Sequence, residues 1–97
     1  MHTVTIVMER LSTSTPWYMD TDEGKAALAR WKEICPAAST SFTQSADHLT
    51  CTMVYDYTSE EVFLSFLATH QDEINSMKEK RTAYNSANGI FRTMTME

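Results

Sequence analysis

Arg81 is the residue whose type and spacing point most directly to chemistry. It lies on a stripe with Ile74, Met77 and Tyr84 at helical spacing, at a position where an apolar residue is expected. An inward-facing arginine must be paired or must extend its head to water, because an unpaired buried charge is very unfavourable. The stripe therefore predicts either a structural arginine or an anion anchor inside a pocket.

Two aromatic residues and a histidine could join Arg81 in a ligand site. Trp17 and Tyr18 lie in a loop rich in Ser and Thr, where they either anchor the loop on the core or cover a ligand. His70 is either a hydrogen-bonded rim residue or a general base, a role that histidine side chains can serve. No nucleophile or carboxylate is tied to it by motif spacing, so we predict no catalytic residue. We predict a ligand pocket lined by six residues: Trp17, Tyr18, Tyr55, His70, Arg81 and Tyr84.

The cysteines and acidic residues form no recognisable metal or redox motif. Cys35 and Cys51 are too few for a disulfide framework, and we expect both to be buried, reduced thiols. Asp20, Asp22 and Glu23 are better explained as acids at a helix N-terminus than as calcium ligands. We therefore predict no metal and no cofactor.

The overall charge excludes one class of partner. Eight Lys and Arg against thirteen Asp and Glu give the 97-residue chain a formal charge of −5. Nucleic-acid binding needs clustered cations, so we predict no nucleic-acid partner. No apolar run approaches the ~20 residues of a membrane span, and no signal-peptide pattern is present. We expect one soluble, cytoplasmic domain over residues 1–97.

Periodicity in the sequence predicts the elements that must position these residues. Residues 3–8 alternate as a strand does, and helical spacing begins at Asp20 or Thr21 and stops before Pro36. A second helix begins at Thr58 or Ser59, is interrupted near residue 70, where Asp72 could cap its second half, and ends at Asn88-Gly89. The predicted elements are strands 3–8, 40–46, 49–56 and 90–96, a helix over 21–35 and the interrupted helix, with a two-residue turn at Asp47-His48.

The order β-α-β-β-α-β predicts a ferredoxin-like α+β fold, a four-stranded antiparallel sheet with both helices on one face. Right-handed connections place strands 3–8 and 49–56 at the centre. The helix-covered side should hold Val4, Ile6, Met8, Cys51, Met53, Tyr55, Ile90, Met94 and Met96. The open side should hold Thr3, Thr5, Val7, Thr50, Thr52, Val54, Phe91, Thr93 and Thr95.

The open side is rich in threonine and nearly free of charge, whereas a solvated sheet face usually carries Lys, Glu and Arg. We therefore predict that two copies stack these faces and form a homodimer, with the nine open-side residues at the interface. A plain exposed threonine face and a heterologous partner, such as a host protein, are the alternatives. Threonine suits a half-buried sheet surface in each case.

The interrupted helix and its last turns, Arg81-Thr82-Ala83-Tyr84-Asn85-Ser86-Ala87-Asn88-Gly89-Ile90, resemble the dimeric α+β barrel superfamily, including the antibiotic-biosynthesis-monooxygenase-like (ABM-like) group. There a broken helix carries an Arg and an aromatic residue and leads through Asn-Gly or His-Gly into the last strand. The resemblance implies a homodimer with a pocket between helices and sheet.

Two functions follow as hypotheses. The first is a non-catalytic binding or interaction protein. The second is a cofactor-independent small-molecule enzyme, monooxygenase- or isomerase-like. The chain is also similar in style to small proteins of tailed-phage genomes, which would make it a phage accessory protein in the host cytoplasm.

Overall fold

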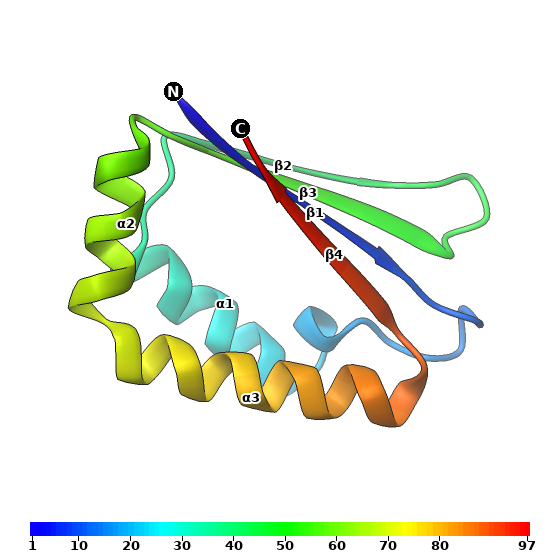
Figure 1. Ribbon diagram of the computed structural model, residues 1–97. Helices are drawn as coiled ribbons and strands as arrows, with labels where there is room; N and C mark the ends of the chain where they lie inside the picture. The colour runs from blue at the N-terminus through cyan, green and yellow to red at the C-terminus, as the bar shows by residue number, and fades with distance from the viewer.

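The computed structural model describes all 97 residues and contains the predicted elements in the predicted order. The four strands form one sheet, and all helices lie on one of its sides (Figure 1). The elements are β1 (His2–Glu9), the 3₁₀ turn η1 (Tyr18–Asp20), α1 (Asp22–Ile34), β2 (Ser39–Gln44), β3 (Thr50–Tyr57), α2 (Glu60–Thr69), α3 (Gln71–Asn88) and β4 (Phe91–Met96).

The sheet is antiparallel throughout and has the strand order β2-β3-β1-β4, so β1 and β3 are central as predicted. Val4 is paired with Tyr55 on one side and with Met96 on the other. Because directly paired residues project to the same face, this register fixes the two faces of the whole sheet. The ends of the chain meet at one edge, where the Thr3 amide donates to the Glu97 carbonyl at 3.0 Å.

Local capping explains where the helices begin and end. The hydroxyls of Thr21 and Ser59 accept hydrogen bonds from the Gly24 and Val62 amides, so each satisfies a free N–H of a first turn. Gly89 ends α3 in the left-handed conformation at φ 66°, which glycine adopts without steric penalty. With Thr21 as its cap, α1 has boundaries within one residue of those predicted.

The β2–β3 connection differs from the predicted two-residue turn. It is a loop over residues 45–49, because polar side chains satisfy the backbone that would otherwise extend both strands. The Asp47 carboxylate accepts from the Ser45 hydroxyl at 2.6 Å and from the Leu49 amide at 3.0 Å. His48 takes a positive φ of 60°. The two strands consequently pair two residues further from the loop tip than expected.

The interruption of the second helix falls at His70, as predicted, but Asp72 is not its cap. His70 alone departs from helical geometry, with φ −119° and ψ 29°. Its amide still donates to the Phe66 carbonyl, and its carbonyl accepts from the Ile74 amide. The hydrogen-bonded backbone thus continues through the junction, and α3 begins at Gln71 without a side-chain cap.

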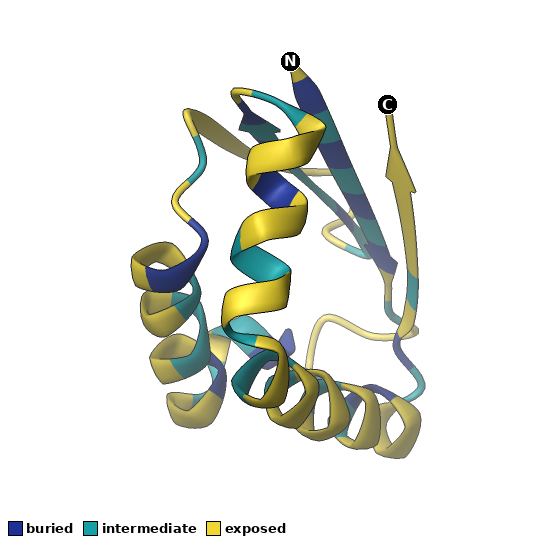
Figure 2. Ribbon diagram, turned by 60° about the vertical axis from the view of Figure 1, so that its left-hand side comes forward, coloured by how far each residue is buried: buried dark blue, intermediate teal, exposed yellow.

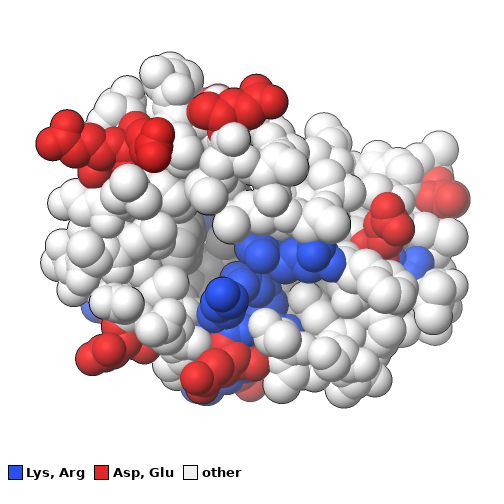
Figure 3. Space-filling model, in the orientation of Figure 1, with Lys and Arg blue, Asp and Glu red and all other residues white.

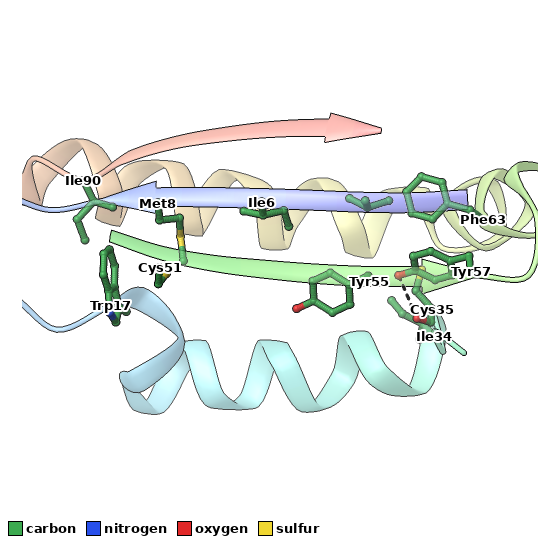
Figure 4. Packing of buried hydrophobic residues seen from close by; sticks show 11 residues of the cluster. Ile6, Met8, Trp17, Ile34, Cys35, Cys51, Tyr55, Tyr57, Phe63 and Ile90 are labelled. Atoms are coloured by element: carbon green, nitrogen blue, oxygen red, sulfur yellow. Dashed lines mark hydrogen bonds between the residues drawn. The ribbon is translucent and has the colours of Figure 1, made fainter. Parts of the chain in front are cut away.

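The buried core is one cluster that runs along the two central strands and reaches both ends of the sheet (Figure 4). At one end Trp17 packs near Met8, Cys51 and Ile90. At the other end Tyr57 and Phe63 lie over the end of α1, with ring centroids 4.8 Å apart. Tyr57, beyond the predicted end of its strand, is 1% exposed and its hydroxyl donates to the Cys35 carbonyl at 3.4 Å. Between the two groups, Figure 4 labels Ile6 and Tyr55.

Both edge strands keep apolar side chains exposed on the helix-facing side. Met94 and Met96 lie on this side, as predicted, but they are 46% and 49% exposed and do not belong to a buried methionine cluster. The helices cover the central strands and leave the β4 edge open (Figure 2). Phe42, on the opposite edge strand, is likewise 47% exposed.

Gly24 tests how tightly the turn after β1 is docked onto α1. A Cβ there would lie 1.7 Å from the Tyr18 carbonyl oxygen, so no side chain fits without a backbone shift. Helix propensity alone favours Ala over Gly by about 1 kcal/mol. We predict the opposite: Gly24→Ala should lower the free energy of unfolding by about 2 kcal/mol, measured by urea denaturation.

Ala29→Gly at an exposed position of the same helix is the control, because it changes propensity alone. It should lower the free energy of unfolding by about 1 kcal/mol. An unchanged or raised stability of Gly24→Ala would show that the turn is loosely docked.

Candidate functional site

Two arginines face the space between α3 and the sheet. Arg81 lies on the half-buried stripe of α3 that also carries Ile74, Met77 and Tyr84. Arg92 is paired with the buried Met8, and this register places it on the helix-facing side of β4. The last helix and the last strand therefore each bring one cation to the same layer of the molecule.

Neither guanidinium has a partner within the protein. No carboxylate lies within 4.0 Å of either, and neither donates a hydrogen bond; the ion pairs of the chain both involve Arg30. Burial and, to a smaller extent, the Arg81 charge lower the pKa of Arg92 to about 10, while Tyr55 acts in the opposite direction. Burial also lowers the pKa of Arg81, which Tyr18 partly offsets. Both remain protonated near neutral pH, so the space between α3 and the sheet holds two partly desolvated positive charges.

The opening of this space is visible on the surface. Figure 3 shows a hollow between the sheet and α3, with Lys and Arg side chains gathered in it and acidic groups toward the outer parts of the view. We define the arginine cleft by four residues on the helix-facing side of β4 and on the facing stripe of α3: Arg81, Arg92, Met94 and Met96.

Two further grooves flank α1. One, of about 430 Å³, lies between α1 and the β2–β3 edge, and its wall includes Tyr55, Phe42 and Lys32. The other, of about 300 Å³, lies between α1 and α3, and its wall includes Tyr18, Met77 and Lys80. The first has the volume of a small-molecule pocket, and both are open to solvent along α1.

The structure places the predicted aromatic residues in two settings. Trp17 is 1% exposed, lies beneath the Arg10 guanidinium at 4.2 Å from its ring centroid, and donates to Gln44 at 3.3 Å. This is the loop-anchoring alternative. Tyr18 stacks on Tyr84 at 5.4 Å, and its hydroxyl donates to Glu23 at 3.1 Å.

Tyr84 completes the attachment of this loop. Its hydroxyl donates to the Pro16 carbonyl at 2.6 Å and so ties α3 to the loop before η1. Tyr18 and Tyr84 thus form one wall next to Arg81, whereas Trp17 supports this wall from the core.

The remaining predicted residues diverge. Tyr55 is buried on β3, where burial raises the pKa of its hydroxyl and the Arg92 charge lowers it. His70 lies at the α2–α3 junction, and its side chain makes no hydrogen bond. The six residues therefore do not surround one cavity: Tyr18 and Tyr84 accompany Arg81, Tyr55 lines the groove between α1 and the β2–β3 edge, and Trp17 and His70 lie apart from both.

Sequence reasoning missed Arg92. The signal was present, because Ile90, Arg92, Met94 and Met96 alternate along the last strand and place Arg92 among helix-facing residues. It also missed Asn85, which is 7% exposed on α3 with a buried Oδ1 that has no partner. A polar residue in the last turns of a helix gives no sequence signal that its side chain will be buried.

The nine residues predicted for a dimer interface all lie on the open side of the sheet by register. The two central strands contribute half-buried side chains, and Phe91 on β4 is 65% exposed. Asp56 also lies here, and its two oxygens accept from the hydroxyls of Thr3 at 2.7 Å and Ser39 at 3.0 Å. These hydroxyls hold the pKa of Asp56 below its usual value.

Comparison with known proteins identifies the fold. No family model matches this chain, and no curated protein matches it either. Among solved structures it is similar to a dimeric ferredoxin-like protein from an uncultured marine organism, with a TM-score of 0.67 and 14% identity over 99% of this chain and 92% of that one. The fold is ferredoxin-like. At that level of identity the similarity extends to architecture alone.

Other kinds of site are not found in the structure. No group of three or more His, Cys, Asp or Glu side chains is arranged to hold a metal ion. None of the helices combines the length and the apolar character needed to cross a bilayer. The arginine cleft brings together two partly buried arginines that have no ion pair within the chain.

The two cysteines predict a pH dependence of stability. Burial raises the pKa of Cys35 and Cys51 to about 11 from an ordinary value of 9.0. Between these values the unfolded chain loses protons that the folded chain keeps, so stability is full below pH 9 and falls as the pH rises toward 11. From pH 8 to pH 10 each thiol should lower the free energy of unfolding by about 1.3 kcal/mol, so the two together should lower it by about 2 to 3 kcal/mol in urea titrations.

Cys51→Ala is the internal check on this prediction. It removes one of the two titrating thiols, so the decrease between pH 8 and pH 10 should be roughly halved. An equally steep decrease in this variant would assign the effect to other groups.

Arg92 predicts an unusual effect on stability. Because its charge is partly desolvated and unpaired, Arg92→Met should raise the free energy of unfolding by about 1 kcal/mol at pH 7 and low salt. Arg30→Met, at an exposed ion-paired arginine, should leave it nearly unchanged. A clear destabilisation by Arg92→Met would mean that the arginine is a structural element of the fold.

Proposed function

We propose that the protein is a homodimeric binding protein whose two copies pack the open faces of their sheets together. The observation that carries this proposal is the nature of that face. Its central strands present Thr3, Thr5, Val7, Thr52 and Val54, with no Lys or Arg. A sheet face that is solvated on one side usually alternates apolar and charged residues.

The size of the open face supports a dimer of modest area. Four strands about 4.8 Å apart and six to eight residues long give a flat area of about 400 to 500 Å². Two such faces bring about 1,000 Å² into contact, which is near the lower limit for a specific interface. Phe91 extends the patch at the β4 edge, because it is directly paired with Glu9 and projects on the same side.

Of the two carboxylates on this face, Glu9 lies at the end of β1 beside Phe91, and Asp56 can be covered at low free-energy cost. Asp56 already accepts two short hydrogen bonds from Thr3 and Ser39. A carboxylate whose oxygens have donors loses less on leaving water than a bare one. The solved structure to which the chain is similar is also described as dimeric, which favours self-association over a heterologous partner.

Stacking the open faces leaves the helix side of each copy free. The arginine cleft and the grooves beside α1 then remain accessible, and this separation supports a binding role. It also accords with the resemblance to the dimeric α+β barrels. That superfamily includes ABM-like enzymes, so a small-molecule enzyme is the alternative function. The enzyme and phage hypotheses both remain predictions.

Val54→Lys tests the dimer. Val54 lies in the middle of β3, paired with Thr5 on one side and Ser41 on the other, so two copies would bring two lysines into one interface. An unpaired buried charge there should weaken association by 2 kcal/mol or more, or about 30-fold. Light scattering coupled to size exclusion should give about twice 11.1 kDa for the wild type and 11.1 kDa for the variant.

Ala29→Lys is the matched control, since it adds the same charge on the exposed face of α1. It should remain dimeric. A wild-type protein that stays at 11.1 kDa at high concentration, or a Val54→Lys variant that still dimerises, would overturn the proposed interface.

A further inference from the structure

We propose that the arginine cleft binds a small amphiphilic anion, an oxyanion carried on an apolar chain, with the oxyanion on Arg81 and Arg92 and the chain against Met94 and Met96. This inference rests on the proposed binding function and names the class of ligand. It rests on the charges of Arg81 and Arg92, the exposed Met94 and Met96 and the geometry of β4, which the proposed dimer interface leaves free.

The first argument is the missing counter-charge. Arg81 and Arg92 are half-buried, close enough to repel each other, and free of any carboxylate or hydrogen-bond acceptor within the chain. The chain does have thirteen acidic residues, and two of them, Glu33 and Glu73, pair with the exposed Arg30. An anion from outside the chain would neutralise both buried charges at once.

The second argument is the type of cation. Guanidinium groups present fixed N–H donors that match the paired oxygens of a carboxylate or a phosphate. Two guanidinium groups from different elements, α3 and β4, can hold one oxyanion between them. The aromatic wall beside Arg81 comes from Tyr18 on η1 and Tyr84 on α3.

The third argument is the apolar track beside Arg92. Met94 and Met96 follow it on the same side of β4 and are about half exposed, although they face the helix layer. Arg92 and Met96 are four residues apart on a strand, which is about 13 Å, roughly the length of an eight- to ten-carbon chain. Methionine side chains adapt to flexible apolar ligands, so this track fits an alkyl chain or a small ring system.

The experiment compares four probes on the intact protein in Tris chloride buffer, which contains no oxyanion. Octanoate and octyl phosphate have both the anion and the chain, acetate has the anion alone, and octylammonium has the chain with the opposite charge. At about ten times its dissociation constant, octanoate should raise the melting temperature by about 5 °C or more. Acetate and octylammonium should leave it unchanged.

The two oxyanions distinguish the sources of the ligand. Tighter binding of octyl phosphate in calorimetric titration would point to a phosphate monoester, and tighter binding of octanoate to a carboxylic acid. Either result supports the proposal, because both need the arginines. An equal shift of the melting temperature with octylammonium would mean that the cleft binds the alkyl chain alone, and this would overturn the proposal.

Variants assign the binding to named residues. Arg81→Met and Arg92→Met should each weaken octanoate binding at least about tenfold, whereas Arg92→Lys should retain part of it because the charge stays and the two-donor geometry is lost. Lys25→Met, on the exposed face of α1, removes the same charge elsewhere and should bind octanoate as the wild type does. Wild-type affinity in both methionine variants would overturn the proposal.

The outcomes separate this inference from the dimer proposal. A monomeric protein that binds octanoate through Arg81 and Arg92 would overturn the dimer alone. A dimer whose melting temperature responds to none of the four probes would overturn the anion site alone. Should Arg92→Met fail to fold, the four probes on the wild type and the octanoate affinity of Arg92→Lys still test the anion site.

Discussion

The packing of the helices and the η1 loop onto the central strands, through one continuous cluster of buried side chains, governs the rest of this structure. Trp17 with its neighbours holds one end of the sheet, and Tyr57 with Phe63 holds the other. Full burial of an aromatic side chain stabilises a fold by about 2 to 3 kcal/mol, so each group is a strong attachment. The cluster draws on the central strands β1 and β3 and includes no residue of β2 or β4, so the edge strand β4 keeps Met94 and Met96 exposed. The arginine cleft lies at this uncovered edge.

Much of the fold could be predicted because its determinants are local and periodic. The alternation of Val4, Ile6 and Met8 indicates a strand with one buried face, and Thr21 and Gly89 mark helix ends by their own chemistry. The five-residue loop before β3 could not be predicted from its residue types. It depends on Asp47 accepting two hydrogen bonds at once, which is a property of the folded loop.

The candidate site was predictable only in part, for a reason that is also physical. Arg81 is conspicuous because a charge on an apolar helical stripe conflicts with the rest of its pattern. Whether that charge meets a carboxylate depends on tertiary contacts, and in this chain Arg81 has no ion pair and its charge acts on a second arginine, Arg92. The exposure of Met94 and Met96 has the same origin, since alternation assigns a side chain to a face but does not say how far the covering layer reaches.

The acidic character of the chain and the cationic cleft act over different distances. A net charge of −5 disfavours the approach of anions from afar, but salt at physiological concentration screens exposed charges beyond about 8 Å. Inside the cleft two guanidinium groups are partly removed from water, and their field is weakened far less by salt. An anion is therefore attracted only once its charged head enters the cleft. This arrangement favours a ligand with a chain that gains free energy from apolar contact as well, and it disfavours bare ions and polyanions.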